Sequence, residues 1–189
     1  PANIFADAPM APARSWSGCY AGIQGGVAIM DTKASLADTP PGTTTYITLD
    51  GLGATGAAFG GTVGCDVQLA KSGLVLGAWG TYDKFNQVAW NLDIMPPGGI
   101  NFHTALDSQW AAGVRVGFVP FSSTMLFAKA GYSQLKMDAF SGTAGGTAIG
   151  SLSMPTFNGY VVGGGLETAM GGGWYLGAEY TAGIYQNAS

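Results

Sequence analysis

Residues 106–118, with the sequence LDSQWAAGVRVGF, alternate between two kinds of side chain along most of their length. One set is apolar and mostly bulky, and it consists of Trp110, Ala112, Val114, Val116 and Phe118. The other set is small or polar, and it consists of Gln109, Ala111, Gly113, Arg115 and Gly117. A period of two residues predicts a β-strand with one apolar face and one small, polar face. The charge of Arg115 therefore falls on the polar face.

The same alternation recurs in six further segments, so the sequence predicts an all-β protein. The expected strands cover about residues 16–30, 54–69, 74–86, 106–118, 124–134, 157–168 and 174–185. The short connections between them are 70–73, 119–123 and 169–173, and the long ones, rich in Thr, Gly, Pro and Ser, are about 31–53, 87–105 and 135–156. Short turns at one end and long loops at the other are typical of an antiparallel up-and-down transmembrane β-barrel.

The composition favours the same class of protein. Hydrophobic residues make up 47% of the 189 residues and charged residues only 10%, where roughly a quarter is usual for a soluble domain. No stretch approaches the roughly 20 consecutive apolar residues that a membrane-spanning helix needs. A closed barrel is the other solution, because strand pairing satisfies every backbone group while apolar side chains face lipid. A soluble β-sandwich is the alternative, but it would place many Lys or Glu residues on its outer face.

Several short motifs carry a resemblance to a known family. They are WSGCYAG at 16–22, GGTVGCDVQ at 60–68, LVLGAW at 74–79, YVVGGGLE at 160–167 and WYLGAEY at 174–180. The sequence resembles the small porin-like outer-membrane proteins of alphaproteobacteria. This resemblance implies an outer-membrane barrel of about eight strands that is exposed at the cell surface. Some members of that family are regarded as porins and others as haem-binding proteins.

The two ends of the chain give further expectations. Residues 16–189 are expected to form one barrel domain, and residues 1–15, PANIFADAPMAPARS, an extended periplasmic segment left after signal-peptide removal. Only seven strands are visible, whereas bacterial single-chain barrels have even strand numbers. We therefore expect an eighth strand that the given sequence lacks. The expected location is the bacterial outer membrane, with extracellular loops and a periplasmic N-terminus.

Cys19 and Cys65 fall on the same face of the first two expected strands. Pairing them directly places Ile23 opposite Gly61 and Val27 opposite Ala57, and leaves residues 31–53 as the loop. A cross-strand disulfide is one hypothesis, and two free thiols are the alternative.

Five charged residues lie on the inward faces of the expected strands: Asp66, Arg115, Lys129, Glu167 and Glu179. Counted from the short turns, Arg115 lies level with Asp66 and Lys129 with Glu179, while Glu167 lies closer to its turn. The expected role is a set of paired charges that fills the lumen. The alternative is a polar path for water or small ions, but inward-pointing aromatic residues should plug it, namely Tyr20, Trp79, Phe127, Tyr175 and Tyr185.

Aromatic residues recur at a fixed height on the outward faces. On four of six strands, the outward residue eight positions from a short turn is aromatic, and these residues are Tyr82, Trp110, Tyr132 and Tyr160. Eight residues of tilted strand rise on the order of 20 Å, close to the apolar band of a membrane barrel. These residues are predicted to form the aromatic girdle at one membrane interface, with Trp174 at the other.

The functional expectation is a structural outer-membrane protein without enzymatic activity, cofactor or metal. The single histidine, His103, is expected in a long loop, and no nucleophile–base–acid spacing accompanies it. The net charge of −4 excludes a nucleic-acid partner. Expected partners are outer-membrane lipid and lipopolysaccharide, together with either another membrane protein or further copies of the chain. A narrow channel and a surface receptor or adhesin, for haem among other ligands, are the alternative functions.

Overall fold

A computed structural model describes residues 15–38, 45–69, 73–94, 100–121, 123–144, 147–152 and 156–186, and these ranges contain strands and turns but no helix. The strands are β1 (Gly18–Asp38), β2 (Thr45–Gln68), β3 (Leu74–Asn86), β4 (Ala89–Ile94), β5 (Ile100–Phe121), β6 (Thr124–Met137), β7 (Phe140–Ala144), β8 (Thr147–Leu152), β9 (Phe157–Gly171) and β10 (Trp174–Gln186). The predicted N-terminal segment 1–15 lies outside the described residues except for Ser15.

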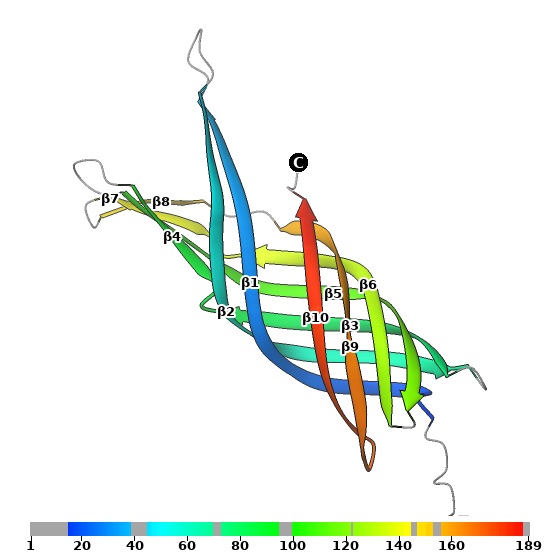
Figure 1. Cartoon of the computed structure of the whole chain (residues 1–189). Helices are drawn as coiled ribbons and strands as arrows, with labels where there is room; N and C mark the ends of the chain where they lie inside the picture. Colours follow the sequence, from blue (N-terminus) through cyan, green and yellow to red (C-terminus); the bar gives the residue numbers. More distant parts are fainter. Residues whose placement is uncertain are drawn as a thin grey trace, which may run out of the picture.

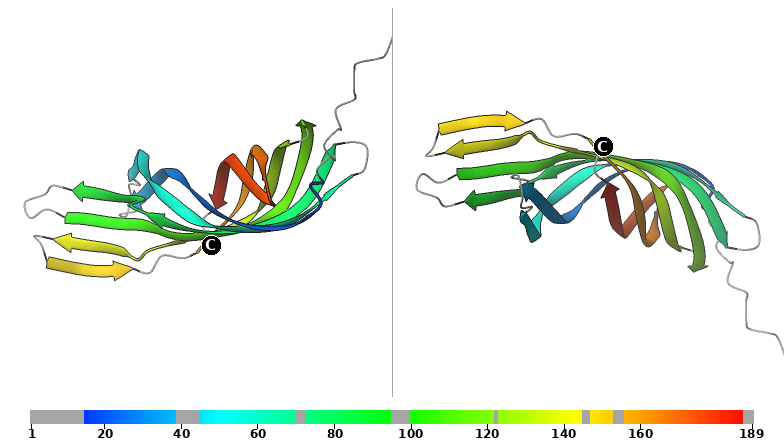
Figure 2. Two further views of the ribbon diagram at one scale, coloured as in Figure 1. Left: turned by 90° about the horizontal axis from the view of Figure 1, so that it is seen from below. Right: turned by 90° about the horizontal axis from the view of Figure 1, so that it is seen from above.

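Seven long strands form one antiparallel sheet in the order β1-β2-β3-β5-β6-β9-β10 (Figure 1). They correspond one to one to the seven predicted strands, so the prediction of an antiparallel up-and-down sheet is confirmed. The sheet curls into an open half-barrel with a concave and a convex face (Figure 2). Among the described residues no pairing joins the edge strands β1 and β10.

The prediction that residues 31–53, 87–105 and 135–156 are loops is wrong for much of their length. The β1–β2 ladder continues to the pair Asp38↔Thr45, with a register shift between Thr32 and Ala34. Strand β4 pairs with the early part of β5, which contains His103, and β7 pairs with β5 and β8. These segments are rich in Thr, Gly, Pro and Ser and show no sustained alternation of apolar and polar residues, so the sequence gives no strand signal there.

The three short turns agree with the sequence. The β2–β3 turn is closed by a backbone hydrogen bond from Leu69 N to Leu74 O of 2.8 Å. In the β9–β10 turn Gly172 and Gly173 have φ angles of 60° and 85°. Two adjacent positive φ angles suit the tight hairpin turns that match strand twist, and glycine adopts them without steric cost.

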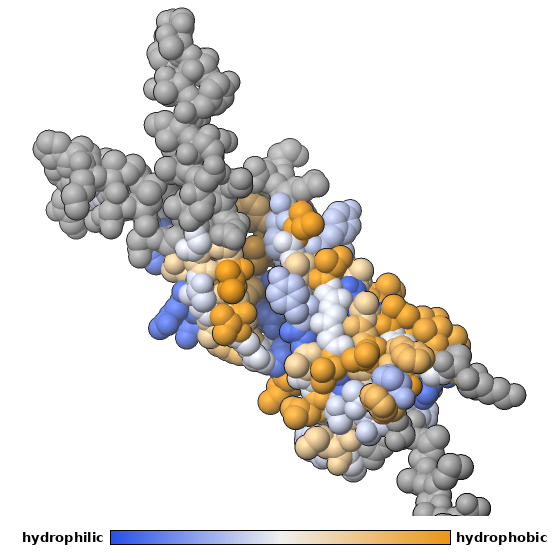
Figure 3. Space-filling model, viewed as in Figure 1, coloured by the Kyte–Doolittle hydropathy of each residue, from blue (hydrophilic) through white to orange (hydrophobic). Residues whose placement is uncertain are grey.

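Burial alternates along β3 and β6 as predicted. In β6, Met125, Phe127, Lys129 and Ser133 are buried on the concave side, whereas Leu126 and Tyr132 are exposed on the convex side. Many exposed residues of the sheet are apolar (Figure 3). Among them is Ile23, which is 96% exposed. Many large apolar side chains thus point outward, whereas a soluble β-sandwich buries such side chains between its sheets. The described residues contain no helix that is long and apolar enough to span a membrane.

Candidate functional site

Cys19 and Cys65 are direct partners in the β1–β2 ladder and form a disulfide with an S–S distance of 2.06 Å. The register also places Ile23 opposite Gly61 and Val27 opposite Ala57. The disulfide hypothesis and the predicted register are therefore confirmed. Both cysteines are exposed on the convex face, so the bond ties two strands together outside the packed interior.

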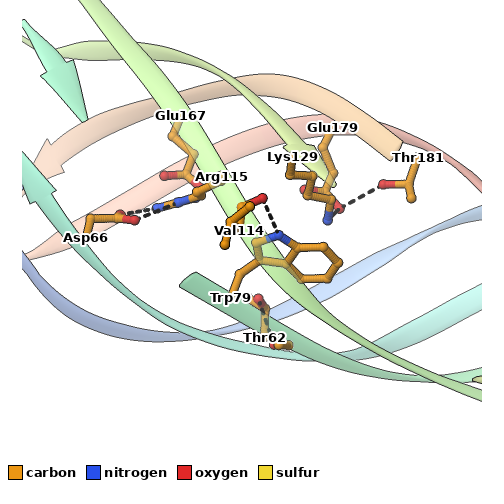
Figure 4. A network of polar contacts seen from close by, with 10 residues as sticks. Thr62, Asp66, Trp79, Val114, Arg115, Lys129, Glu167, Glu179 and Thr181 are labelled. Atoms are coloured by element: carbon orange, nitrogen blue, oxygen red, sulfur yellow. Dashed lines mark hydrogen bonds and ion pairs between the residues drawn. The ribbon is translucent and has the colours of Figure 1, made fainter. Parts of the chain in front are cut away.

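Arg115 of β5 lies at the centre of the concave face. Its Nε donates to Asp66 Oδ1 at 2.9 Å, and its Nη2 donates to the second carboxylate oxygen, so the pair is bidentate. Its Nη1 donates to Glu167 Oε1 at 2.7 Å. Figure 4 shows both carboxylates pointing toward the guanidinium. The side chains of Arg115 and Asp66 are 5% and 4% exposed, so this pair is almost completely removed from solvent.

The sequence placed Arg115 level with Asp66 and Glu167 closer to its turn. Asp66 and Arg115 are both register partners of Gly77, which confirms that they lie level. Glu167 lies nearer its turn, as expected, yet it reaches the same guanidinium. The long side chain of arginine ends in a planar guanidinium with donors on several sides. It therefore reaches Glu167 although the two residues lie at different heights in the sheet.

Lys129 of β6 forms the second ion pair, with 2.6 Å between its Nζ and Glu179 Oε1 of β10. The ammonium also lies 4.2 Å from the centre of the Trp79 ring, within range of a cation–π interaction. Trp79 is held in turn by a hydrogen bond of 3.1 Å from its Nε1 to Val114 O (Figure 4). The predicted pairing of Lys129 with Glu179 is therefore present, and an inward aromatic residue covers it.

Aromatic rings also cover Arg115. The guanidinium carbon lies 4.5 Å from the ring centre of Tyr20 and 5.3 Å from that of Phe127. The Tyr20 ring occupies the space that a side chain at Gly64 would need, since a Cβ placed there would collide with the Tyr20 hydroxyl. Gly64 thus makes room for a neighbouring side chain rather than for an open passage.

Two further polar contacts on the concave face were not predicted. Gln24 Nε2 donates to Asp83 Oδ1 at 2.7 Å, which connects β1 to β3 across β2. The hydroxyls of Ser133 and Tyr185 lie 3.0 Å apart and connect β6 to β10. Both pairs join strands that are not neighbours, so neither could be found from the register of one hairpin.

The outward aromatic residues form a continuous band. Tyr82 is the register partner of Trp110, whose ring centre lies 5.7 Å from that of Tyr132, and Tyr132 lies 6.3 Å from Tyr160. All four are exposed on the convex face. Two of them form side-chain hydrogen bonds: Trp110 Nε1 donates to Gln134 Oε1 at 3.0 Å, and the Tyr132 hydroxyl donates to Asn158 Oδ1 at 2.8 Å. Trp174, at the start of β10, is 77% exposed beside a short turn at the opposite end.

A cavity of about 620 Å³ lies beside the ion pairs, between β1 and β10, and Tyr20, Arg115, Glu167 and Glu179 line it. Within the described ranges no group of three or more His, Cys, Asp or Glu side chains could hold a metal ion. What this arrangement does chemically is to neutralise buried charges against one another and against aromatic faces.

An antiparallel sheet that curls, turns its apolar side chains outward and gathers its charges inside defines a protein that crosses a membrane with β-strands. The chain belongs to the family described as outer membrane protein beta-barrel domain, whose profile matches residues 2–188. It is an outer-membrane β-barrel protein. No curated protein and no solved structure matches the chain.

Proposed function

We propose that the protein is a structural component of the bacterial outer membrane whose lumen is filled by side chains and does not conduct. Its role would then lie in its outer wall and in the hairpins opposite the short turns. The observation that carries this proposal is the packing around Arg115, which Asp66, Glu167, Tyr20 and Phe127 surround.

The size of the barrel supports the same proposal. A barrel of about eight strands has an interior just wide enough for its own side chains. Here the concave face carries Trp79, Phe127 and Met125 as well as the ion pairs, and all three are at most 8% exposed. An open water path would need these large side chains to lie elsewhere.

A narrow channel for small solutes, in keeping with the porin-like resemblance, is the second candidate. The cavity of about 620 Å³ favours it, because Arg115, Lys129, Glu167 and Glu179 line the cavity. Charged side chains along a passage are the usual means by which barrels select ions. The receptor or adhesin hypothesis, with haem as one ligand, depends on the hairpin ends, and the side chains of residues 31–52 and 90–102 lie outside the described part.

The proposal extends to location and partners. We expect the convex face to contact outer-membrane lipid and lipopolysaccharide, with either another membrane protein or further copies beside it. The hairpin ends would be extracellular and the short turns and N-terminus periplasmic, as is usual for outer-membrane barrels. Enzymatic activity is not expected, since proteins of this family are generally not enzymes.

Single-channel recording in a planar bilayer tests the proposal. We expect no ion-selective conductance steps from the purified protein over many insertions, and none from the Glu179→Gln variant. An Arg115→Ala variant should open leak events, because the substitution removes the side chain that fills the centre of the concave face. Stable, ion-selective steps from the unaltered protein that change with Arg115→Ala would instead establish the channel.

A further inference from the structure

The disulfide lies on the convex side of the sheet, among apolar side chains. Cys19 and Cys65 are both exposed there. Val63 and Val67, the outward neighbours of Cys65 on its own strand, are 59% and 60% exposed. On β3 the register partner of Cys65 is Ala78, which is exposed as well. The bond therefore lies within an apolar part of the surface that we assign to lipid.

The position of the bond along the strands places it between the two membrane interfaces. Cys65 lies four residues from Leu69, beside the short β2–β3 turn, and four residues of tilted strand rise on the order of 10 Å. Its partner Ala78 lies midway along β3 between Leu74 and Tyr82, which is one of the outward aromatic residues. The apolar band of such barrels is about 25 Å tall, so bilayer hydrocarbon would cover the bond in the inserted protein.

Thiol–disulfide exchange needs a charged nucleophile. A thiolate attacks a disulfide sulfur, a mixed disulfide forms, and a second thiolate then displaces the remaining half of the oxidant. The two cysteines lose two electrons to a small disulfide oxidant, which leaves as two thiols carrying the two protons. Hydrocarbon strongly disfavours the thiolate, because a charge without partners is costly to remove from water. The exchange should therefore stop once the cysteines enter the membrane.

The bond also joins segments that must already lie side by side when it forms. Cys19 and Cys65 are 46 residues apart in sequence and are direct partners in the β1–β2 ladder. From this pair the ladder continues to Thr32↔Leu52 without a register shift. A bond formed before insertion would hold the two strands in this register while the hairpin enters the membrane.

We propose that Cys19 and Cys65 are oxidised by exchange with a disulfide oxidant in the aqueous phase, before the β1–β2 hairpin enters the membrane, and that the bilayer then protects the bond from reduction. The oxidation thus precedes the insertion step, and the bond becomes a permanent tie between β1 and β2 once the barrel is in place. This inference rests on the proposed contact of the convex face with lipid, and it adds an order of steps to assembly.

The same ladder offers a matched control. Ile29 and Thr55 are also direct partners in the β1–β2 ladder and are exposed on the convex face. They lie ten positions further along each strand (19 to 29 and 65 to 55), past the level of the outward aromatic residues. The control variant carries Ile29→Cys and Thr55→Cys, with serine in place of both natural cysteines. It moves the bond out of the apolar band and keeps the same face and the same kind of pairing.

Reduction of the inserted protein is the first measurement. The unsubstituted protein and the control variant, both oxidised, are refolded into phospholipid vesicles and treated with reduced glutathione, and free thiols are counted by alkylation and mass spectrometry. We expect the Cys19–Cys65 bond to be reduced at least about 100-fold more slowly than the bond of the control variant. In concentrated urea without vesicles the two bonds should be reduced at similar rates, which excludes a difference in intrinsic reactivity.

The order of steps is the second measurement. Each protein, with its thiols reduced, receives oxidised glutathione either before or after vesicles are added. Cys19 and Cys65 should form their bond only when the oxidant comes first, whereas the control variant should be oxidised in either order. Failure of the reduced, unsubstituted protein to insert would also place oxidation before insertion.

Equal reduction rates for the two bonds in vesicles, or oxidation of Cys19 and Cys65 after insertion, would overturn the proposal. The lipid contact is tested separately by unfolding of a Val114→Arg variant, since Val114 is the register partner of Ala78 in the same row. A large loss of stability in that variant together with a reactive Cys19–Cys65 bond would refute the order of assembly alone. Absence of that loss would refute the lipid contact itself, so the two failures are distinguishable.

Discussion

At the scale of single residues, Arg115 shows how a buried charge is retained in this fold. Its guanidinium meets two carboxylates and two aromatic rings, so every side of the group has a partner. Burial of a charge is costly unless such partners are present. The free energy of unfolding should therefore depend strongly on this one side chain.

Arg115→Met should lower the free energy of unfolding by about 3–5 kcal/mol, because Asp66 would remain buried without its cation. Urea unfolding of the protein refolded into phospholipid vesicles measures this change. Lys84→Met is the matched control, since Lys84 also forms an ion pair, 2.7 Å from Asp107, but its side chain is 46% exposed. Solvent screens this exposed pair. We expect a far smaller effect, and equal losses for both variants would contradict the account.

The disulfide is a second prediction at this scale. Cys19 and Cys65 are 46 residues apart in sequence and joined across one ladder. Replacing both with serine should lower the free energy of unfolding by about 2–4 kcal/mol, without a change in register. Denaturation of the two proteins side by side gives the difference. Mass spectrometry should find no alkylatable thiol before reduction, and two such thiols would show that the bond does not form.

At the scale of elements, the β-strands depend on glycines that face inward. A Cβ added at Gly77 would collide with the Asp66 carboxylate and lie 2.9 Å from the Cys65 carbonyl oxygen. At Gly80, on the outward face of the same strand, the nearest atom would be Ala111 O at 3.7 Å. The two glycines therefore differ in the space around them although they lie on one strand.

Gly77→Ala should destabilise the protein by about 1–3 kcal/mol, as expected for an overpacked site. Gly80→Ala should change the free energy of unfolding by no more than about 0.5 kcal/mol. Both values come from urea unfolding under identical conditions. A neutral Gly77→Ala would mean that the concave face is looser than its contacts indicate.

The strands also show how far the sequence alone leads. All seven strands of the curled sheet could be predicted, because alternation of apolar and small side chains marks a strand with two different faces. The register of β1 on β2 followed from Cys19 and Cys65. Strands β4, β7 and β8 could not be predicted, since they extend hairpins whose composition is typical of loops. Likewise, the pairing of Gln24 with Asp83 depends on the curl of the sheet, which brings β1 near β3 and leaves no mark in either segment.

At the scale of the whole molecule, the convex face is the feature that assigns the protein to the membrane. Val114 lies on this face, midway between Trp110 and Phe118 along β5, and is 66% exposed. Met170, near the β9–β10 turn, is exposed to the same extent, at 67%. The two residues are equally exposed in the protein alone. In a bilayer they would differ in depth, with Val114 near the midplane and Met170 near an interface.

The most direct measurement compares Val114→Arg with Met170→Arg by urea unfolding from phospholipid vesicles. A charge at the bilayer midplane costs about 2–4 kcal/mol, whereas one near the interface costs at most about 1 kcal/mol. We predict the large loss for Val114→Arg and the small loss for Met170→Arg. Small and equal losses at both positions would contradict the claim that the convex face of the half-barrel lies against lipid.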